Sequence, residues 1–293
     1  MAGVSRPAGF AVVAVTYLAA GLAGWGVAAA TAAYPPLTRT LWADLAATAV
    51  VFAVSTAVGN ASLYDPYWSV APPVIIAAWV IHSGGLTGRQ ALVLALVLIW
   101  AVRLTANWAV SWRGLGHEDW RYVQIRDQTR GRLPWWLVNL TGIQVMPTLV
   151  VFAGLLAVWP AVTVDAPLGV LDAVAAAVTA AAIATEALAD WQLRRFAGDP
   201  ANRGQILDSG LWRYSRHPNY LGEICFWWGL WVFALSAAPS WWWTIVGPLA
   251  MVLLFTVVSV PLMDRRSLSR RPQYANHIRH TRALLPFPRL RRS

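Results

Sequence analysis

Eight stretches of mainly apolar residues follow one another along this chain, with short polar segments between them. They cover approximately residues 9–30, 41–62, 66–83, 90–112, 134–159, 168–192, 218–238 and 241–263. Most of these stretches reach the length of about 20 residues that a helix needs to cross the hydrocarbon layer of a membrane. None shows the alternation of polar and apolar positions that is typical of a barrel strand. The pattern therefore predicts an all-α protein that crosses the membrane several times.

The third stretch, residues 66–83, differs from the others. It is short, and it contains Pro72 and Pro73, which remove hydrogen-bond donors from a helix. We expect a broken or partly interfacial segment here. The chain is predicted to form a bundle of seven to eight membrane-spanning helices, with cytoplasmic loops and a basic C-terminal segment that closes a pocket.

Composition agrees with this pattern. The chain has 293 residues, of which 58% are hydrophobic and 12% are charged. An ordinary soluble domain has about 25% charged residues. We find no internal repeat and no long linker, so residues 1–293 are expected to form a single membrane domain. The first apolar stretch has about 22 residues, which exceeds the length of a signal peptide core, and we interpret it as a retained helix.

The arginines are distributed unevenly between the two sides of the predicted bundle. With eight spans, one side collects Arg6, five arginines in residues 113–133, five in residues 193–217 and nine after Met263, while the other side has only Arg39 and Arg89. By the positive-inside rule, both termini are expected in the cytoplasm, and the protein in the inner membrane. The same rule accounts for the net charge of +10, so no nucleic-acid site is needed to explain it.

The most polar cluster next to an apolar stretch is the segment GLWRYSRHPNYLGE at residues 210–223. Pro218 suits the first turn of a helix, where free backbone N–H groups and a nearby Arg216 form a site for phosphate. The alternative is a helix cap with an arginine that reaches lipid headgroups. The cluster has more polar side chains than a cap requires, which favours cofactor binding by Arg213, Arg216, His217, Asn219, Tyr220 and Glu223.

A second group of charges lies at the end of the sixth stretch. Glu186, Asp190 and Arg194 are four residues apart and therefore share one face of a helix. They can form a ladder of ion pairs, but charges at membrane depth usually face a cavity or a partner. Asp190 could accept a hydrogen bond from a ribose or an amide, and we count it among the candidate cofactor ligands.

Polar residues also occur in and after the fourth stretch. Arg103 lies near the middle of that stretch with Asn107 one turn later, and both are candidate cofactor ligands, although an ion pair would also satisfy Arg103. His117 is followed directly by two acidic residues. Adjacent residues of a helix do not converge on one ion, so we predict no metal here and expect His117 to bind the cofactor or to order its loop.

Two further segments have less specific patterns. Tyr64, Asp65 and Tyr67 lie between the second and third stretches, and a tyrosine bound to a carboxylate can polarise a substrate carbonyl. The alternative is an Asp-Pro turn with aromatic anchors on each side. Residues 270–282 are predicted to form a basic helix, which either binds anionic lipid or closes over a cofactor.

Taken in order, these segments resemble bacterial membrane proteins of the steroid 5-alpha-reductase-like family. The matching pieces are YDPYWS at 64–69, RLTANW at 103–108, GHEDWRY at 116–122, EALADWQ at 186–192, GLWRYSRHPNYLGE at 210–223 and RRPQY at 270–274. The resemblance implies a helical membrane reductase that passes a hydride from NADPH to the beta carbon of an enone while an acid polarises the ketone. It assigns cofactor contacts to Asp190, Asn219 and Glu223. The Gln-Glu pair of the eukaryotic enzymes is absent, and Tyr64, Asp65 and Tyr67 are our substitutes for it.

The run R-H-P-x-Y-x-G at residues 216–222 is also similar to that of isoprenylcysteine and phospholipid methyltransferases, which bind S-adenosylmethionine. NADPH is strongly anionic, whereas S-adenosylmethionine carries a sulfonium cation, so Arg203, Arg213 and Arg216 favour NADPH. A non-catalytic membrane scaffold is a third hypothesis, but it leaves the clustered polar residues unexplained. We therefore predict an NADPH-dependent membrane oxidoreductase that acts on a steroid- or isoprenoid-like lipophilic substrate, with cofactor motifs in residues 103–293. Its expected partners are the bilayer and that substrate, without nucleic acid or an obligatory protein partner.

Overall fold

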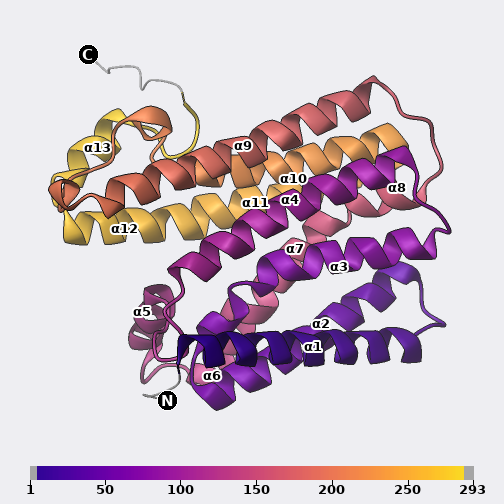
Figure 1. The fold of residues 1–293 in the computed structure, drawn as a ribbon, viewed down its shortest axis with the longest axis horizontal. Helices are drawn as coiled ribbons and strands as arrows, with labels where there is room; N and C mark the ends of the chain where they lie inside the picture. Colours follow the sequence, from indigo (N-terminus) through magenta and orange to yellow (C-terminus); the bar gives the residue numbers. More distant parts are fainter. Residues whose placement is uncertain (1–4, 287–293) are drawn as a thin grey trace. The chain divides into compact units, whose positions relative to one another are not determined.

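The computed structural model describes residues 5–286, and this part of the chain is almost entirely helical, with no strands (Figure 1). Seven helices within it are long and apolar enough to cross a membrane. They are Arg6–Ala30 (α1), Pro36–Val58 (α2), Gly88–Ser111 (α4), Trp135–Leu155 (α6 and α7), Val170–Gly198 (α9), Pro218–Ala237 (α10) and Pro239–Arg270 (α11 and α12). The predicted polytopic all-α membrane fold is confirmed.

The remaining helices are shorter. They are Tyr67–His82 (α3), Trp120–Thr129 (α5), Val158–Thr163 (α8) and Tyr274–His280 (α13). The third apolar stretch folds as α3, whose 16 residues continue through Pro72 and Pro73. At a rise of about 1.5 Å per residue, α3 extends about 24 Å, which is less than the hydrocarbon thickness of about 30 Å. This length separates α3 from the seven longer helices.

The chain forms two compact units. The first comprises Met1–Gly85 and Val97–Leu156, and the second comprises Leu86–Leu96 and Ala157–Ser293. In the first unit, α1 and α2 lie side by side (Figure 1). A buried polar network joins its helices, because the Tyr67 hydroxyl donates to Asp44 Oδ1 at 2.6 Å, and Thr148 bonds with both Tyr64, at 2.7 Å, and Thr48, at 2.9 Å.

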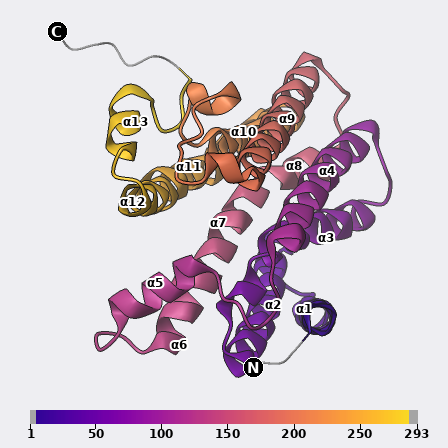
Figure 2. The ribbon, with the colours of Figure 1, turned by 60° about the vertical axis from the view of Figure 1, so that its left-hand side comes forward.

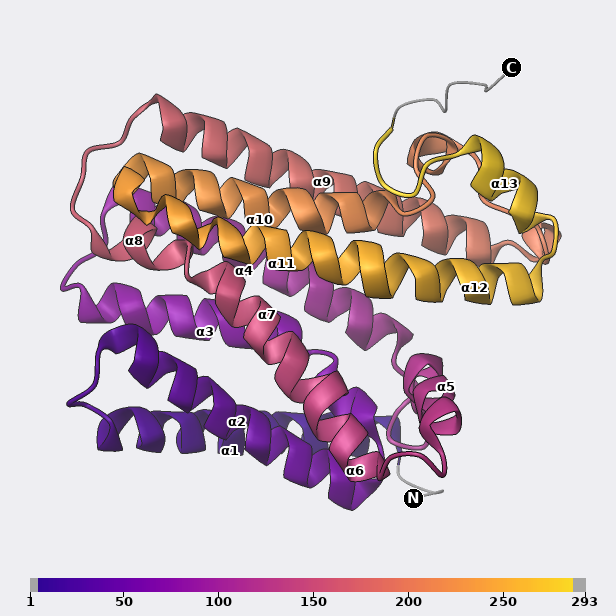
Figure 3. The same cartoon turned by 180° about the vertical axis from the view of Figure 1, so that it is seen from behind.

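In the second unit, α9, α10 and the α11–α12 helix run alongside one another (Figure 3). Two glycines of α10 allow α9 to approach closely. A Cβ atom on Gly222 would lie 2.4 Å from Glu186 Cγ, and one on Gly229 would lie 2.2 Å from Thr179 Oγ1. The two glycines are seven residues apart and therefore share one helical face, as in close-packed membrane helices.

Two of the long helices contain a wider, π-helical segment. Asn139–Val145 connects α6 (Trp135–Val138) to α7 (Met146–Leu155), and Leu254–Ser259 connects α11 (Val246–Leu253) to α12 (Val260–Arg270). Such segments are rare and often occur at functional sites. In the second of them, Phe255 packs against Tyr220 at the start of α10, with ring centroids 4.9 Å apart.

A buried ion pair holds the N-terminal end of α9 in the second unit. Arg89 and Asp172 are each only 3% exposed, and Arg89 Nε lies 2.7 Å from Asp172 Oδ1. The same guanidinium donates to the carbonyl groups of Ala166 and Pro167, at 2.9 and 2.8 Å. Asp172 also accepts from the backbone N–H of Gly169 and from the hydroxyl of Ser236. Arg89 therefore fixes the loop before α9, in addition to any contribution to membrane orientation.

Candidate functional site

The loop that precedes α10 is fastened to the end of α9. Trp212, which is buried, donates from its indole nitrogen to the carbonyl of Ala189 at 3.1 Å. The backbone N–H of Leu211 donates to Gln192 Oε1 at 3.0 Å. Gly210 has a φ of 59°, and a Cβ atom there would lie 2.4 Å from the Gln192 side chain, so only glycine fits this turn. These contacts fix the position at which the polar motif of residues 215–223 begins.

Helix α10 begins at Pro218, as the sequence predicted. The backbone N–H groups of Tyr220 and Leu221 donate to the carbonyl of His217, at 3.1 and 3.2 Å. The first turn therefore has fewer free N–H groups than we expected. Asn219 extends sideways and donates from Nδ2 to Asp190 Oδ1 on α9 at 3.2 Å. Asp190, a predicted cofactor ligand, is therefore in contact with the motif through Asn219.

An aspartate of α12, Asp264, binds the residues of the motif that precede α10, Arg216 and His217. Asp264 accepts from Arg216 at two points, with Nη2 2.7 Å from Oδ2 and Nε 3.3 Å from Oδ1. His217 Nε2 lies 3.0 Å from Asp264 Oδ1, and the Tyr274 hydroxyl donates to the same oxygen at 3.1 Å. A carboxylate can only accept, so His217 carries a proton on Nε2. Arg216 is 5% exposed, and its charge is balanced within the protein.

The C-terminal strap, which we define as residues 271–286, closes beside the motif. The backbone N–H groups of Arg216 and His217 donate to the carbonyls of Arg282 and Ala283, each at 3.0 Å, in a short parallel pairing. The Ser215 hydroxyl also donates to the carbonyl of Ala283, at 2.9 Å, and Arg216 Nη1 donates to the carbonyl of Thr281. The strap includes α13, which folds back beside α12 (Figure 2).

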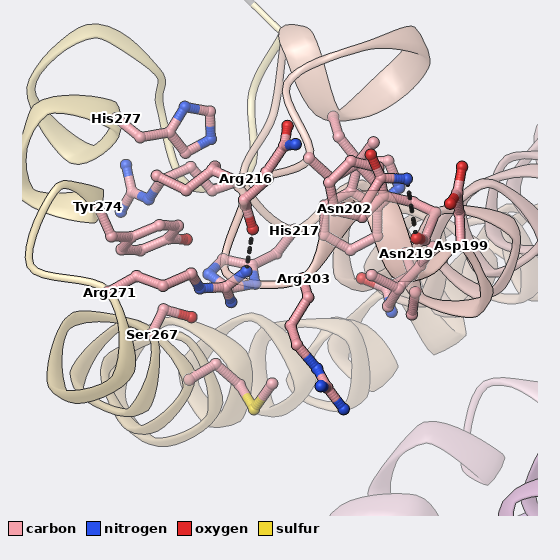
Figure 4. Close-up of a pocket in the computed structure, with 18 of the residues that line it drawn as sticks. Asp199, Asn202, Arg203, Arg216, His217, Asn219, Ser267, Arg271, Tyr274 and His277 are labelled. Atoms are coloured by element: carbon pink, nitrogen blue, oxygen red, sulfur yellow. Dashed lines mark hydrogen bonds between the residues drawn. The ribbon is translucent and has the colours of Figure 1, made fainter.

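The first cavity has a volume of about 590 Å³ and lies between the end of α9, the motif, α12 and the strap (Figure 4). Its apolar lining includes Phe196, Leu207 and Trp212. Its polar lining includes Arg203 and Arg271, which Figure 4 shows among the labelled side chains. Arg271 donates to the carbonyl of Gln205 at 2.6 Å. Neither arginine forms an ion pair with a carboxylate among residues 5–286.

The second cavity, of about 770 Å³, lies between the loop of residues 206–213 and the strap. Ile206 and His277 line both cavities. Burial and the nearby charge of Arg216 lower the pKa of His277, so its imidazole is neutral at pH 7. Burial and the Asp264 carboxylate raise the pKa of Tyr274, which keeps this hydroxyl protonated as a donor.

The predicted residues of the second unit take different places. Arg216, His217, Asn219 and Tyr220 line the first cavity, and the rings of His217 and Tyr220 stack with centroids 5.2 Å apart. Arg213 lines the second cavity. Asp190 contacts the motif through Asn219, whereas Glu223 lines neither cavity and accepts from the Trp227 indole at 2.9 Å.

In the first unit, Tyr64 and Tyr67 are buried and bonded to Thr148 and Asp44, as described above. Asp65 accepts from the hydroxyl of Tyr122, and Arg121 lies 3.5 Å from it. Burial raises the pKa of Asp65 to about 6.

The three other candidates of this unit lie on α4 and in the loop after it. Arg103 and Asn107 belong to α4, and both take part in interactions. His117 has an exposed side chain, and its carbonyl accepts from Asn60 Nδ2 at 3.2 Å. This contact orders the start of the loop.

Sequence reasoning missed Asp264, although a signal existed. It is the only acidic residue after Glu223, in a region with many arginines. It also missed Arg271 and Tyr274 as residues of the cavity, because their place depends on how the strap folds back. Within residues 5–286, no group of three or more His, Cys, Asp or Glu side chains is arranged to hold a metal ion.

Comparison with known proteins places the chain in a family. Residues 51–281 match the family described as "Protein of unknown function (DUF1295)". A protein of the fission yeast Schizosaccharomyces pombe, described as "Uncharacterized protein C594.04c", is 26% identical, in a match that covers 77% of this chain and 72% of the yeast protein. No solved structure matches the chain. Because the family match extends over most of the sequence and includes every motif discussed above, the chain belongs to the DUF1295 family, which is of the steroid 5-alpha-reductase-like type.

Proposed function

We propose that this protein is a membrane-embedded reductase that uses NADPH to reduce a carbon–carbon double bond conjugated to a ketone in a lipophilic substrate. The observation that carries the proposal is the first cavity, whose lining combines apolar side chains with two arginines that form no ion pair with a carboxylate in the described chain. This combination suits a cofactor with a flat ring at one end and phosphates at the other.

The charges that line the first cavity favour an anionic ligand. Arg203, Arg216 and Arg271 line it, against a single carboxylate, Asp199. Asp264 already balances Arg216, so we assign the phosphate contacts to Arg203 and Arg271, and we regard Arg216 as an anchor of the fold. A guanidinium binds phosphate through two parallel hydrogen bonds. S-adenosylmethionine has one carboxylate and a sulfonium cation, which such a lining would repel.

The apolar and aromatic part of the lining can receive the nicotinamide ring. Phe196 and Trp212 supply apolar surface, and the stacked rings of His217 and Tyr220 supply an aromatic edge. The cofactor, when bound, supplies the hydride. The residues of the chain hold and orient it, and the buried Trp212 and Leu207 exclude water from this wall. Asn219, held by Asp190, presents an amide to the same cavity.

Reduction of an enone also requires an acid for the ketone oxygen. The predicted candidates for this role, Tyr64, Asp65 and Tyr67, belong to the first unit, and among them the Tyr67 hydroxyl donates to the carboxylate of Asp44 at 2.6 Å. Tyr64 and Asp65 have other partners, Thr148 and Tyr122, and rank behind it. Tyr67→Phe removes this hydroxyl together with its hydrogen bond to the buried Asp44, and we expect the folded variant to lose turnover and to keep NADPH binding.

A thermal-shift titration of the purified protein in detergent tests the proposal, with NADPH and S-adenosylmethionine as the two ligands. A ligand at 100 times its dissociation constant stabilises the folded state by about 2.7 kcal/mol. We expect NADPH to stabilise the folded state in this way. The double variant Arg203→Gln with Arg271→Gln should show a smaller stabilisation by NADPH. Arg270→Gln is the matched control, since Arg270 is exposed and lines neither cavity. Stabilisation by S-adenosylmethionine alone would indicate a methyltransferase, and stabilisation by neither ligand would favour a scaffold.

A further inference from the structure

The second cavity has a lining unlike that of the first. Of the ten residues around it, only Ile206 and Gly210 lack a polar side chain. It shares Ile206 and His277 with the lining of the first cavity, so the two cavities are neighbours. A hydrophobic wall suits a nicotinamide ring, but a lining of hydroxyl, amide, imidazole and guanidinium groups suits a ribose, a phosphate and a base edge.

Two opposite charges face this cavity. Arg213 is exposed at the end of the loop and forms no ion pair within residues 5–286. Asp208 lines the same cavity five residues earlier and is also exposed. An arginine beside a ribose accommodates a 2′-phosphate, whereas a carboxylate there accepts from a free 2′-hydroxyl. The cavity thus contains one group that favours each form of a dinucleotide.

Asn276 offers a recognition group for a base. It lies on α13, lines the second cavity, and its side-chain amide has no hydrogen-bond partner in the described chain. A side-chain amide can bond with both the amino group and the ring nitrogen at the edge of an adenine. The neighbouring Gln273 cannot offer the same contact freely, because its amide donates to the carbonyl of Gly204 at 3.1 Å.

We propose that the second cavity binds the phosphorylated adenosine end of the dinucleotide, with Arg213 on the 2′-phosphate and Asn276 on the adenine edge. The inference rests on the proposed function, and it adds the residues that choose between NADPH and NADH. Asp208 opposes Arg213, so the balance between these two side chains sets the preference. His277 lines both cavities, so it lies where the two ends of one dinucleotide would meet.

The dissociation constants of NADPH and NADH for the full chain in detergent, measured by calorimetry, test this assignment. We expect Arg213→Ala to weaken NADPH binding about 10-fold to 100-fold and to change NADH binding less than about threefold, because only NADPH has the 2′-phosphate. Asp208→Asn should strengthen NADPH binding and weaken NADH binding. Asn276→Ala should weaken both equally. Arg270→Ala, another exposed arginine outside both cavities, should change neither.

The outcomes separate this inference from the proposed function. If the wild-type chain binds NADPH and Arg213→Ala leaves the ratio of the two constants unchanged, the inference is wrong and the reductase proposal stands. If the wild-type chain binds neither dinucleotide, the reductase proposal fails. Titration with adenosine 2′,5′-bisphosphate then tests the assignment of the second cavity independently of the reductase proposal. Binding that depends on Arg213 supports this assignment, and the absence of binding overturns it.

A lipid phosphate is the other source of the same chemistry. Repeating the NADPH titration in nanodiscs of phosphatidylcholine, with and without phosphatidylglycerol, distinguishes the two sources. We expect NADPH binding to persist in both. If Arg213→Ala instead reduces the retention of phosphatidylglycerol and leaves NADPH binding unchanged, the cavity is a headgroup site and the inference is overturned.

Discussion

Removing the carboxylate of Asp264 should loosen the end of the second unit without unfolding its helices. Asp264 is the common acceptor for Arg216, His217 and Tyr274, at 2.7, 3.0 and 3.1 Å. Breaking a buried ion pair by removing one partner costs about 3–5 kcal/mol, because it leaves an uncompensated charge. Arg216 is 5% exposed and Asp264 is 14% exposed, so we expect Asp264→Ala to cost about 3 kcal/mol, at the lower end of this range.

A double-mutant cycle separates the ion pair from the loss of packing. Arg216→Gln alone leaves Asp264 with the donors His217 and Tyr274, whereas the double variant with Asp264→Asn removes both charges of the ion pair. The coupling free energy of residues in direct contact ranges from about 0.5 to 3 kcal/mol, and we expect a value near 2 kcal/mol for this two-point pair. If the stability changes of the two single variants add up to that of the double variant, the reasoning is refuted, since the two charges then do not interact.

Two measurements carry this prediction. Unfolding in mixed micelles of increasing sodium dodecyl sulfate, followed by tryptophan fluorescence, gives the stability change. Hydrogen exchange of the backbone amides locates it, and we expect faster exchange at Arg216 and His217, whose N–H groups pair with the strap. Asp165→Asn is the control, since this aspartate is exposed in the loop before α9. Equal loss of protection along α9 and α10 would show that the effect is global and that the strap is not a separate element.

Three further predictions concern other parts of the chain. The pKa of His277 is lowered in the folded state, so the unfolded chain binds more protons below a pH of about 6.5. We therefore expect the backbone amides of the strap to exchange hydrogen faster as the pH drops below this value. His277→Gln should remove this pH dependence, whereas His82→Gln should not. Gly222→Ala should destabilise by about 1–3 kcal/mol in the same unfolding assay, because the added methyl group meets Glu186 and a backbone carbonyl, whereas Gly21→Ala meets nothing and should be neutral or slightly stabilising. With the seven long helices and α3 as an eighth crossing, both termini lie on one side, so reporters that fluoresce only in the cytoplasm, fused to each terminus, should both fluoresce. A dark C-terminal fusion would indicate seven crossings and would contradict the predicted orientation.

The positions of the membrane helices could be predicted because hydrophobic length specifies them, but their exact ends could not. The sixth stretch was expected to end near residue 192, yet α9 continues to Gly198. Polarity does not stop a helix, whereas the Asp199-Pro200 step does, since a residue before proline avoids the helical conformation. Similarly, α2 begins at Pro36, before its apolar stretch, and ends at Val58, because the next residue, Gly59, has a φ of 70° and caps the helix. The helix ends are thus determined by glycine and proline residues, which a search for apolar stretches does not detect.

The association of Asp190 with Asn219 could be anticipated, because both lie at the same end of consecutive long helices. The partner of Arg216 could not. Asp264 is 48 residues away, and its approach depends on how α12 packs and how the strap folds back. The sequence also suggested that every polar residue of the motif faces one ligand. In the structure the motif divides, because its backbone is non-helical at His217, with φ −140° and ψ 64°, and helical from Pro218 onward.

This division explains why the motif resembles two classes of enzyme. Arg216 and His217 bind Asp264 and the strap, so half of the motif closes the protein around its cavity and does not select a ligand. Closing a membrane bundle over a soluble cofactor is a requirement that a reductase and a methyltransferase share. Under the proposed function, selection then depends on residues outside the motif, and we assign it to Arg203 and Arg271, which line the first cavity. A variant of these two arginines should therefore change which cofactor binds, whereas a variant of Arg216 should change how firmly any cofactor is enclosed.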